Sequence, residues 1–168
     1  TFVIRVPFKI DMNGDKRGKQ KDVSEKSIKG LHILLAEDNE LNMEIAEFML
    51  QNEGAEVTKA WNGQEAVELF RKSRPGEFDV ILMDIMMPVM NGYEATKKIR
   101  SLDREDAKVI PIIAMTANAF TEDRLRAKEA GMDEHIAKPV DGKLLINIIY
   151  KLMKHSFRGS HNEKEKPE

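Results

Sequence analysis

Short apolar segments alternate with amphipathic ones along most of the chain. Continuous apolar or β-branched runs predict strands over residues 31–36, 55–60, 78–83, 109–116 and 134–138. Apolar residues at helical spacing predict helices over residues 39–54, 62–73, 91–102, 118–131 and 141–155. The first and fourth of these helical segments close on a glycine, as helices commonly do.

Regular alternation of strands and helices is typical of an α/β protein, in which helical crossovers join parallel strands. The runs at 31–36, 78–83 and 110–115 are apolar throughout, as expected of strands that helices cover on both faces. Right-handed crossovers leave few topologies for such a chain. We therefore predict a five-stranded, doubly wound parallel sheet with the strand order 2-1-3-4-5.

The two ends of the chain differ from its centre. Residues 1–10 (TFVIRVPFKI) predict a strand, whereas residues 11–30 are rich in Lys, Asp and Gly and predict a linker. The basic residues of the linker could form a binding patch, but the interspersed acidic residues favour a solvated tether. We expect one domain over residues 31–155 and a polar tail over 156–168. A chain that begins with Thr rather than Met is expected to be a piece of a longer protein.

Composition narrows the function classes. The 168 residues suit one domain, and a net charge of −2 favours neither nucleic acid nor a membrane surface as partner. The absence of cysteine excludes disulfides, thiolate metal sites and cysteine nucleophiles, and it fits a reducing compartment. No apolar run approaches the roughly 18 residues that a membrane span needs. We expect a cytoplasmic domain without direct nucleic-acid or membrane contact.

Polar side chains follow the predicted strands at the points where they end. Glu37 and Asp38 follow the first strand, Asp84 the third, Thr116 closes the fourth, and Lys138 closes the fifth. In doubly wound sheets, ligands bind beyond the carboxyl ends of the strands, near the point where the strand order reverses. We therefore expect three carboxylates, a hydroxyl and an ammonium group to converge there.

Converging carboxylates repel one another unless a cation binds between them, and oxygen ligands of this kind suit Mg²⁺. Asp84 interrupts an otherwise apolar run, VILMDIMM, where a buried carboxylate needs a partner. A carboxylate nucleophile beside a metal, a lysine and a hydroxyl suits Mg²⁺-dependent transfer of a phosphoryl group to Asp84.

Simpler interpretations exist for the single residues. Asp38, or its neighbours Glu37 and Asn39, could cap the helix that starts near residue 40. Thr116 alone could be a turn residue, and Lys138 alone a solvated lysine. Asp84 has no helix start to cap, because Ile-Met-Met-Pro follows it. The five residues taken together favour the functional interpretation.

Four motifs carry a family resemblance: LLAEDN (34–39), VILMDIMMPVMNG (80–92), IIAMTAN (112–118) and GMDEHIAKPV (131–140). With these motifs the chain resembles the receiver domain of two-component response regulators, which has a flavodoxin-like fold. The resemblance implies that Asp84 is the phosphoryl acceptor of a phosphorelay. It also implies that Glu37, Asp38, Asp84 and the backbone carbonyl of Met86 hold Mg²⁺.

The resemblance assigns further roles near the last strand. Lys138 matches the invariant lysine of the family, and its bond to Pro139 is expected to be cis. Thr116 matches the switch hydroxyl. His135 stands where many members carry an aromatic switch residue. Phosphorylation is then expected to reorganise the face formed by the strands at 109–116 and 134–138 and the helix at 118–131.

Two further features resemble hybrid sensor histidine kinases. TFVIRVPFKI resembles the closing strand of their ATP-binding domain, and the segments 38–42 and 60–66 resemble their receivers more than transcriptional ones. The resemblance implies a phosphohistidine donor on a kinase dimerisation domain or a histidine phosphotransfer domain. The parent protein could be membrane-anchored, and this piece carries no ATP-binding residues of its own.

Two other function classes are open. A phosphatase that uses an aspartyl phosphate would carry an aspartate two residues after the nucleophile, but position 86 is Met. A degenerate receiver would act only as a protein-binding module, and the complete set of strand-end residues argues against it. Slow loss of the phosphoryl group to water is expected for a working receiver.

Overall fold

The computed structural model describes residues 27–117 and 121–159. The strand predicted over residues 1–10 and most of the predicted linker lie outside the described residues. Five parallel strands form one sheet with the order β2-β1-β3-β4-β5, which confirms the predicted fold class. The strands are β1 (His32–Ala36), β2 (Glu56–Ala60), β3 (Val80–Asp84), β4 (Ile112–Thr116) and β5 (Glu134–Ala137).

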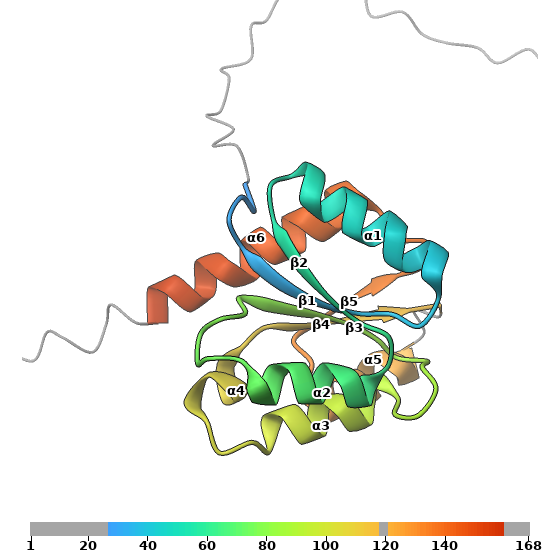
Figure 1. Cartoon of the computed structure of the whole chain (residues 1–168), viewed down its shortest axis with the longest axis vertical. Helices are drawn as coiled ribbons and strands as arrows, with labels where there is room; N and C mark the ends of the chain where they lie inside the picture. Colours follow the sequence, from blue (N-terminus) through green and yellow to red (C-terminus); the bar gives the residue numbers. More distant parts are fainter. Residues whose placement is uncertain (1–26, 118–120, 160–168) are drawn as a thin grey trace, which may run out of the picture.

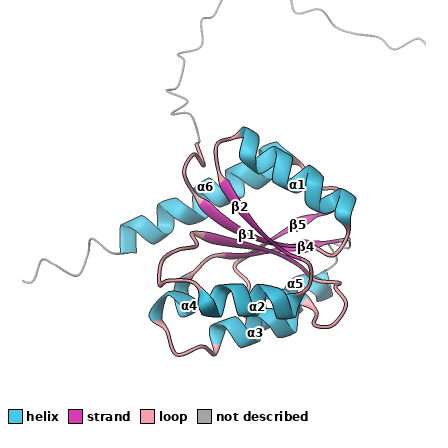
Figure 2. Cartoon of the chain, viewed as in Figure 1, coloured by secondary structure: helices cyan, strands magenta, loops and turns pink. Residues whose placement is uncertain are grey.

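Helices cover both faces of the sheet (Figures 1 and 2). Helices α1 (Glu40–Asn52) and α6 (Gly142–Gly159) lie on one face. The other face carries α2 (Gly63–Lys72), α3 (Gly92–Arg100), α4 (Glu105–Val109) and α5 (Thr121–Ala130). This arrangement explains why the interior residues of β1, β3 and β4 are apolar and buried, since helices cover them on both faces.

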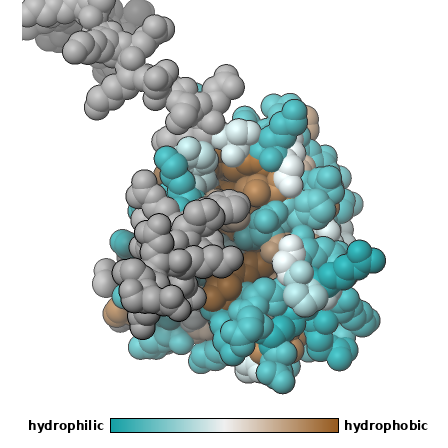
Figure 3. All heavy atoms as spheres, turned by 90° about the vertical axis from the view of Figure 1, so that its left-hand side faces the viewer, coloured by the Kyte–Doolittle hydropathy of each residue, from teal (hydrophilic) through white to brown (hydrophobic). Residues whose placement is uncertain are grey.

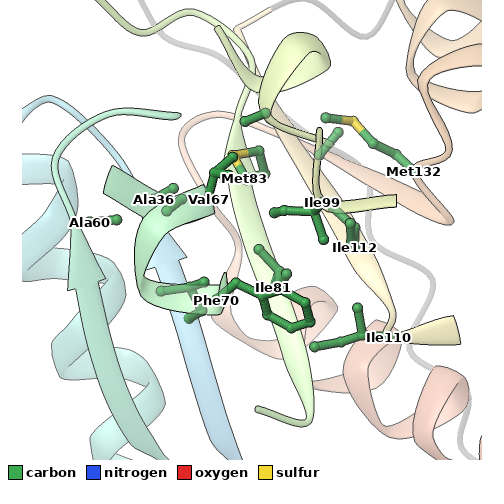
Figure 4. Close-up of a cluster of buried hydrophobic side chains, with 14 of the residues drawn as sticks. Ala36, Ala60, Val67, Phe70, Ile81, Met83, Ile99, Ile110, Ile112 and Met132 are labelled. Carbon is green, nitrogen blue, oxygen red and sulfur yellow. The ribbon is translucent and has the colours of Figure 1, made fainter. Parts of the chain in front are cut away.

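Two separate hydrophobic clusters hold the layers together. The cluster under α2 and α3 includes Phe70, Ile81, Ile99 and Ile112, which interdigitate between the helices and the sheet (Figure 4). The second cluster packs residues of α1 and α6 against the opposite side chains of the same strands. Successive residues of each central strand therefore enter different clusters, as the strand period of two requires.

One helix was not predicted from the sequence, and it shortens a predicted strand. Residues 105–109 form α4, and β4 starts at Ile112 instead of residue 109. Val109 is on the surface of the short helix and is mostly exposed. Pro111 has no N–H to give to a ladder, although its carbonyl accepts from Ile81 N at 2.9 Å. The apolar run VIPII is therefore not one strand: it contains the end of α4, a proline and the start of β4.

The folded part of the chain begins earlier and its last helix ends later than predicted. Ile28, assigned to the linker, is fully buried in the cluster under α1 and α6. Gly30 N donates to Gly54 O at 2.8 Å, which ties this segment to the end of α1. The last residues of the predicted linker, 27–30, thus pack against the domain. Helix α6 continues to Gly159, past the predicted end at residue 155.

The surface is mostly hydrophilic, because most apolar residues lie in the interior. Figure 3 shows one side of the molecule, where hydrophilic residues surround a few apolar patches. Among the described helices, none combines the length and the apolar character that crossing a membrane requires.

Candidate functional site

The predicted site residues come together at one edge of the sheet. Glu37 follows β1 directly, Asp84 is the last residue of β3, and Thr116 is the last residue of β4. Lys138 follows β5 directly. Carboxylate oxygens of Glu37, Asp38 and Asp84 lie within 4.8 Å of one another. The parallel register causes this convergence, because neighbouring strands all end at the same edge.

Lys138 bridges the two buried carboxylates of the site. Its Nζ lies 2.7 Å from Asp84 Oδ2 and 2.5 Å from Glu37 Oε2. Burial would lower the pKa of Lys138, but the hydrogen bonds and the negative charges of Asp84 and Glu37 together raise it above its ordinary value. The lysine therefore carries a fixed positive charge between the carboxylates.

Asp84 is almost completely buried, although it ends an apolar strand. Lys138 binds one of its oxygens, and Met86 N donates to the other, Oδ1, at 3.1 Å. Burial raises the pKa of Asp84, and the negative charge of Glu37 adds to the rise, while Lys138 and Met86 oppose it. Each oxygen thus has a donor that holds the carboxylate in one orientation.

Glu37 is held by the start of α1. Asn39 N donates to Glu37 Oε1 at 3.3 Å, and Asn42 Nδ2 donates to the same oxygen at 3.2 Å. Asn39 itself caps α1, because its side chain accepts from Asn42 N at 3.1 Å. The open question about capping is thereby settled: Asn39 caps the helix, and Asp38 remains exposed at the site.

Thr116 and His135 occupy different surroundings. Thr116 is buried, and its carbonyl accepts from Lys138 N at 2.7 Å, which ties the ends of β4 and β5 together. His135 lies on β5 opposite Ala114 and lines a groove along α5. The peptide bond between Lys138 and Pro139 is cis, as the family resemblance implied. Residues 118–120, part of the face expected to switch, lie outside the described residues.

Some contributors to the site were not singled out from the sequence. The side chain of Asn42 supports Glu37, and the first residues of α2 and α3, Gly63 and Gly92, lie against the segment that follows Asp84. In the sequence, each glycine is marked only by the asparagine before it. The pairs Asn62-Gly63 and Asn91-Gly92 each open a helix.

The donor set fits a hard divalent cation. Three carboxylates face one ammonium group in the described site, so negative charge is in excess. Oxygen ligands are what Mg²⁺ prefers, and it usually keeps several waters besides one or two carboxylates. Exposed Asp38 leaves one side of the cluster open to water. The hydrogen bond from Met86 N places the backbone of Met86 beside the Asp84 carboxylate.

Comparison with known proteins identifies the class. Residues 33–150 match the model of the response regulator receiver domain. The chain belongs to this family, whose members act in two-component signalling.

Two of the similar curated proteins are histidine kinases of much greater length. Histidine kinase 1 of Arabidopsis thaliana is 37% identical over 165 residues, which covers 79% of this chain and 14% of the relative. Hybrid signal transduction histidine kinase M of Dictyostelium discoideum is 43% identical over 122 residues, which covers 72% of this chain and 5% of the relative. The chain thus spans only a small part of these relatives.

Solved structures show the same fold. The receiver domain of sensor histidine kinase PA1611 from Pseudomonas aeruginosa PAO1 is 40% identical, with a TM-score of 0.67, over 74% of this chain and 98% of that one. That crystal structure has a magnesium ion coordinated in its active site cleft. The chemotaxis protein CheY4 of Vibrio cholerae is 29% identical, with a TM-score of 0.67, over 73% of this chain and 98% of that one.

Proposed function

We propose that the domain accepts a phosphoryl group on Asp84 from a phosphohistidine and thereby acts as a relay or switch in two-component signalling. The observation that carries this proposal is the Lys138 ammonium between two buried carboxylates, with a third carboxylate within 4.8 Å of both. A working acceptor needs this charge arrangement, whereas a module that only binds proteins does not.

The chemistry follows from the positions of the side chains. A carboxylate oxygen of Asp84 attacks phosphorus, the bond from phosphorus to the imidazole nitrogen breaks, and an acyl phosphate forms. Lys138 binds the incoming phosphoryl oxygens, and Met86 N–H keeps the carboxylate oriented during attack. The Thr116 hydroxyl, at the end of the adjacent strand, is the donor we assign to the product phosphoryl group.

We assign Mg²⁺ to the site formed by Glu37, Asp38, Asp84 and the backbone carbonyl of Met86. When bound, the ion would neutralise part of the negative charge that gathers during phosphoryl transfer. The donor set supports this assignment, and so does the magnesium-bound receiver of PA1611 among the similar structures. Glu37 needs its supports from Asn39 and Asn42 to keep its carboxylate facing the site.

The surface of α1 supports a protein as the phosphoryl donor. Leu41, Ile45 and Phe48 are 64%, 49% and 69% exposed, and their spacing places them along one side of the helix. A small groove beside them is lined by Ile45, Ala46, Met49, Pro139 and Val140 and reaches Glu37 and Lys138. A partner helix that packs on this stripe would bring its histidine close to Asp84.

We further propose that the domain is the receiver of a hybrid histidine kinase and works in the cytoplasm, whether or not the parent protein is anchored in a membrane. The similarity to histidine kinases several times longer supports the first part. The lack of cysteine in the whole chain fits a reducing compartment. Phosphorylation at Asp84 would then act on the face around β4, β5 and α5 through Thr116.

The fluorescence of Trp61 offers a direct test. Trp61 follows β2, and it is the one tryptophan of the chain. We expect a response to Mg²⁺ and a further response to beryllofluoride, which imitates an aspartyl-bound phosphoryl group. Both should disappear or weaken strongly in Asp84→Asn. If the fluorescence does not respond and calorimetry also detects no Mg²⁺ binding to the unmodified protein, the pocket does not bind the ion. The alternative of a module that only binds proteins is then favoured.

A further inference from the structure

The segment between β3 and α3, residues 85–91, holds a rare backbone conformation next to the acceptor. Val89 has a φ of 67°, in the left-handed region that β-branched residues seldom adopt. Met90 N donates to Pro88 O at 2.7 Å, which closes a three-residue γ-turn around Val89. Such a conformation costs free energy and persists only where the surrounding structure holds it.

Two glycines hold this segment from two different helices. Gly63, the first residue of α2, donates its N–H to Met90 O at 3.1 Å. Gly92, the first residue of α3, donates its N–H to Ile85 O at 3.0 Å. The N–H groups in the first turn of a helix have no acceptor within their own helix, so they are free to bind the segment. The strained turn is therefore fixed on both sides.

Both contacts require the absence of a side chain. A Cβ on Gly92 would overlap the carbonyl oxygen of Asp84 and lie 3.0 Å from its carbonyl carbon. A Cβ on Gly63 would overlap the carbonyl oxygen of Met90 and lie 3.0 Å from the Cβ of Ala95. Neither glycine has a positive φ, so lack of space and not backbone conformation accounts for them.

The contacts reach the reacting carboxylate through the backbone. Gly92 lies against the peptide group of Asp84 itself, and the same segment supplies the Met86 N–H that binds Asp84 Oδ1. We propose that Gly63 and Gly92 are positioning residues for phosphoryl acceptance, because they hold the 85–91 segment, and with it Asp84, in the geometry needed for attack. This inference rests on the function proposed above.

The test compares three glycine-to-alanine variants of the full chain. Gly63→Ala and Gly92→Ala add a methyl group against backbone. Gly142→Ala is the matched control: Gly142 is the first residue of α6, and its Cβ would meet the flexible side chain of Met49, with Sδ at 3.0 Å. Phosphorylation is followed with acetyl phosphate as donor at saturating Mg²⁺, together with Mg²⁺ affinity and thermal unfolding.

We expect both loop variants to lose about tenfold or more of the phosphorylation rate at a temperature where they are folded, since small misplacements of a reacting group cost such factors. Gly142→Ala should keep the rate of the unmodified protein. Lower melting temperatures with unchanged rates in Gly63→Ala and Gly92→Ala would mean a purely structural role and would overturn the inference. If the unmodified protein accepts no phosphoryl group, the proposed function fails instead.

Hydrogen exchange decides the question if the loop variants do not fold. The amide of Gly63 has its acceptor outside α2, so its protection in the unmodified protein reports the contact with Met90 alone. We expect slow exchange at Gly63 and Gly92. Exchange as fast as at an unprotected amide would show that the 85–91 segment is not held, which contradicts the inference.

Discussion

Lys138 explains how Asp84 can end an apolar strand. The lysine reaches both Asp84 and Glu37, so neither of these buried carboxylates lies in the interior without a positive neighbour. The strand-end positions of these residues could be read from the sequence, because parallel strands end at one edge. The supports could not, because the hydrogen bond from Asn42 to Glu37 and the close approach of Gly63 and Gly92 to the 85–91 segment depend on the course of the folded backbone.

Another residue-scale feature is the hydroxyl of Thr96, which is buried in α3 without a hydrogen-bond partner among the described residues. An unsatisfied buried hydroxyl costs free energy, whereas valine has nearly the same shape. We expect Thr96→Val to raise the free energy of unfolding by roughly 1 kcal/mol in urea titrations. Thr96→Ser keeps the hydroxyl and should not stabilise; equal gains in both variants would contradict this explanation.

A pH effect is expected at Asp106. Its carboxylate accepts from Arg104 Nη2 at 2.6 Å and from Gly76 N at 2.9 Å, and the hydrogen bond to Arg104 lowers its pKa from 3.8 to about 2. A pKa lowered by folding stabilises the protein above the unfolded value, and this contribution disappears as pH falls through the folded value.

We therefore expect Asp106→Asn to be less stable than the unmodified protein near neutral pH. The difference in melting temperature should shrink as the pH is lowered from about 4 towards about 2. Asp103→Asn is a suitable control on the same connection. A difference that stays constant over this range would show that Asp106 stabilises the fold by something other than its charge.

At the scale of elements, the sequence predicted the long helices and the strands well because periodicity needs length. Helix α4 spans five residues, which is too short for a helical period to appear, and its apolar end merges with β4. Ile28 was missed for a related reason: it is a single apolar residue in a polar segment, and only the cluster under α1 and α6 shows that it is core.

The buried position of Ile28 predicts that the segment before β1 stabilises the domain. Ile28→Ala should lower the free energy of unfolding by about 2–5 kcal/mol, as is usual for deleting a buried branched side chain. The neighbouring exposed residue provides the control, Lys29→Ala, with an expected change below about 0.5 kcal/mol. Equal and small losses in urea titrations of both variants would restore the linker assignment for residues 27–30.

At the scale of the whole molecule, the site and the apolar stripe of α1 lie at the same end of the domain, since α1 starts directly after Glu37 and Asp38. The topology thus places the proposed acceptor, its charge partners and the proposed docking surface together. Fold class and strand order could be predicted from the sequence because right-handed crossovers allow few alternatives. The alternation of strands and helices that predicts the fold does not identify the partner.

If the apolar stripe of α1 is the docking surface, a substitution in it should slow transfer from a protein donor and leave transfer from a small-molecule donor unchanged. Phe48→Ala should slow phosphoryl transfer from a phosphorylated histidine phosphotransfer protein about tenfold, because a large exposed aromatic contact is lost. The rate with acetyl phosphate should not change. Val109→Ala, an exposed apolar residue on α4, is the control and should leave both rates unchanged. Transfer from the protein donor that does not depend on Phe48 would place the docking surface elsewhere.

The most direct test of the central claim is the intact mass of the protein after incubation with acetyl phosphate and Mg²⁺. We predict an increase by one phosphoryl group that requires Mg²⁺ and is absent in Asp84→Asn, while Asp38→Asn reduces it by weakening the metal site. The adduct should also disappear slowly in water as the acyl phosphate hydrolyses. No adduct on the folded protein, or an adduct that survives in Asp84→Asn, would contradict the claim that Asp84 is the phosphoryl acceptor.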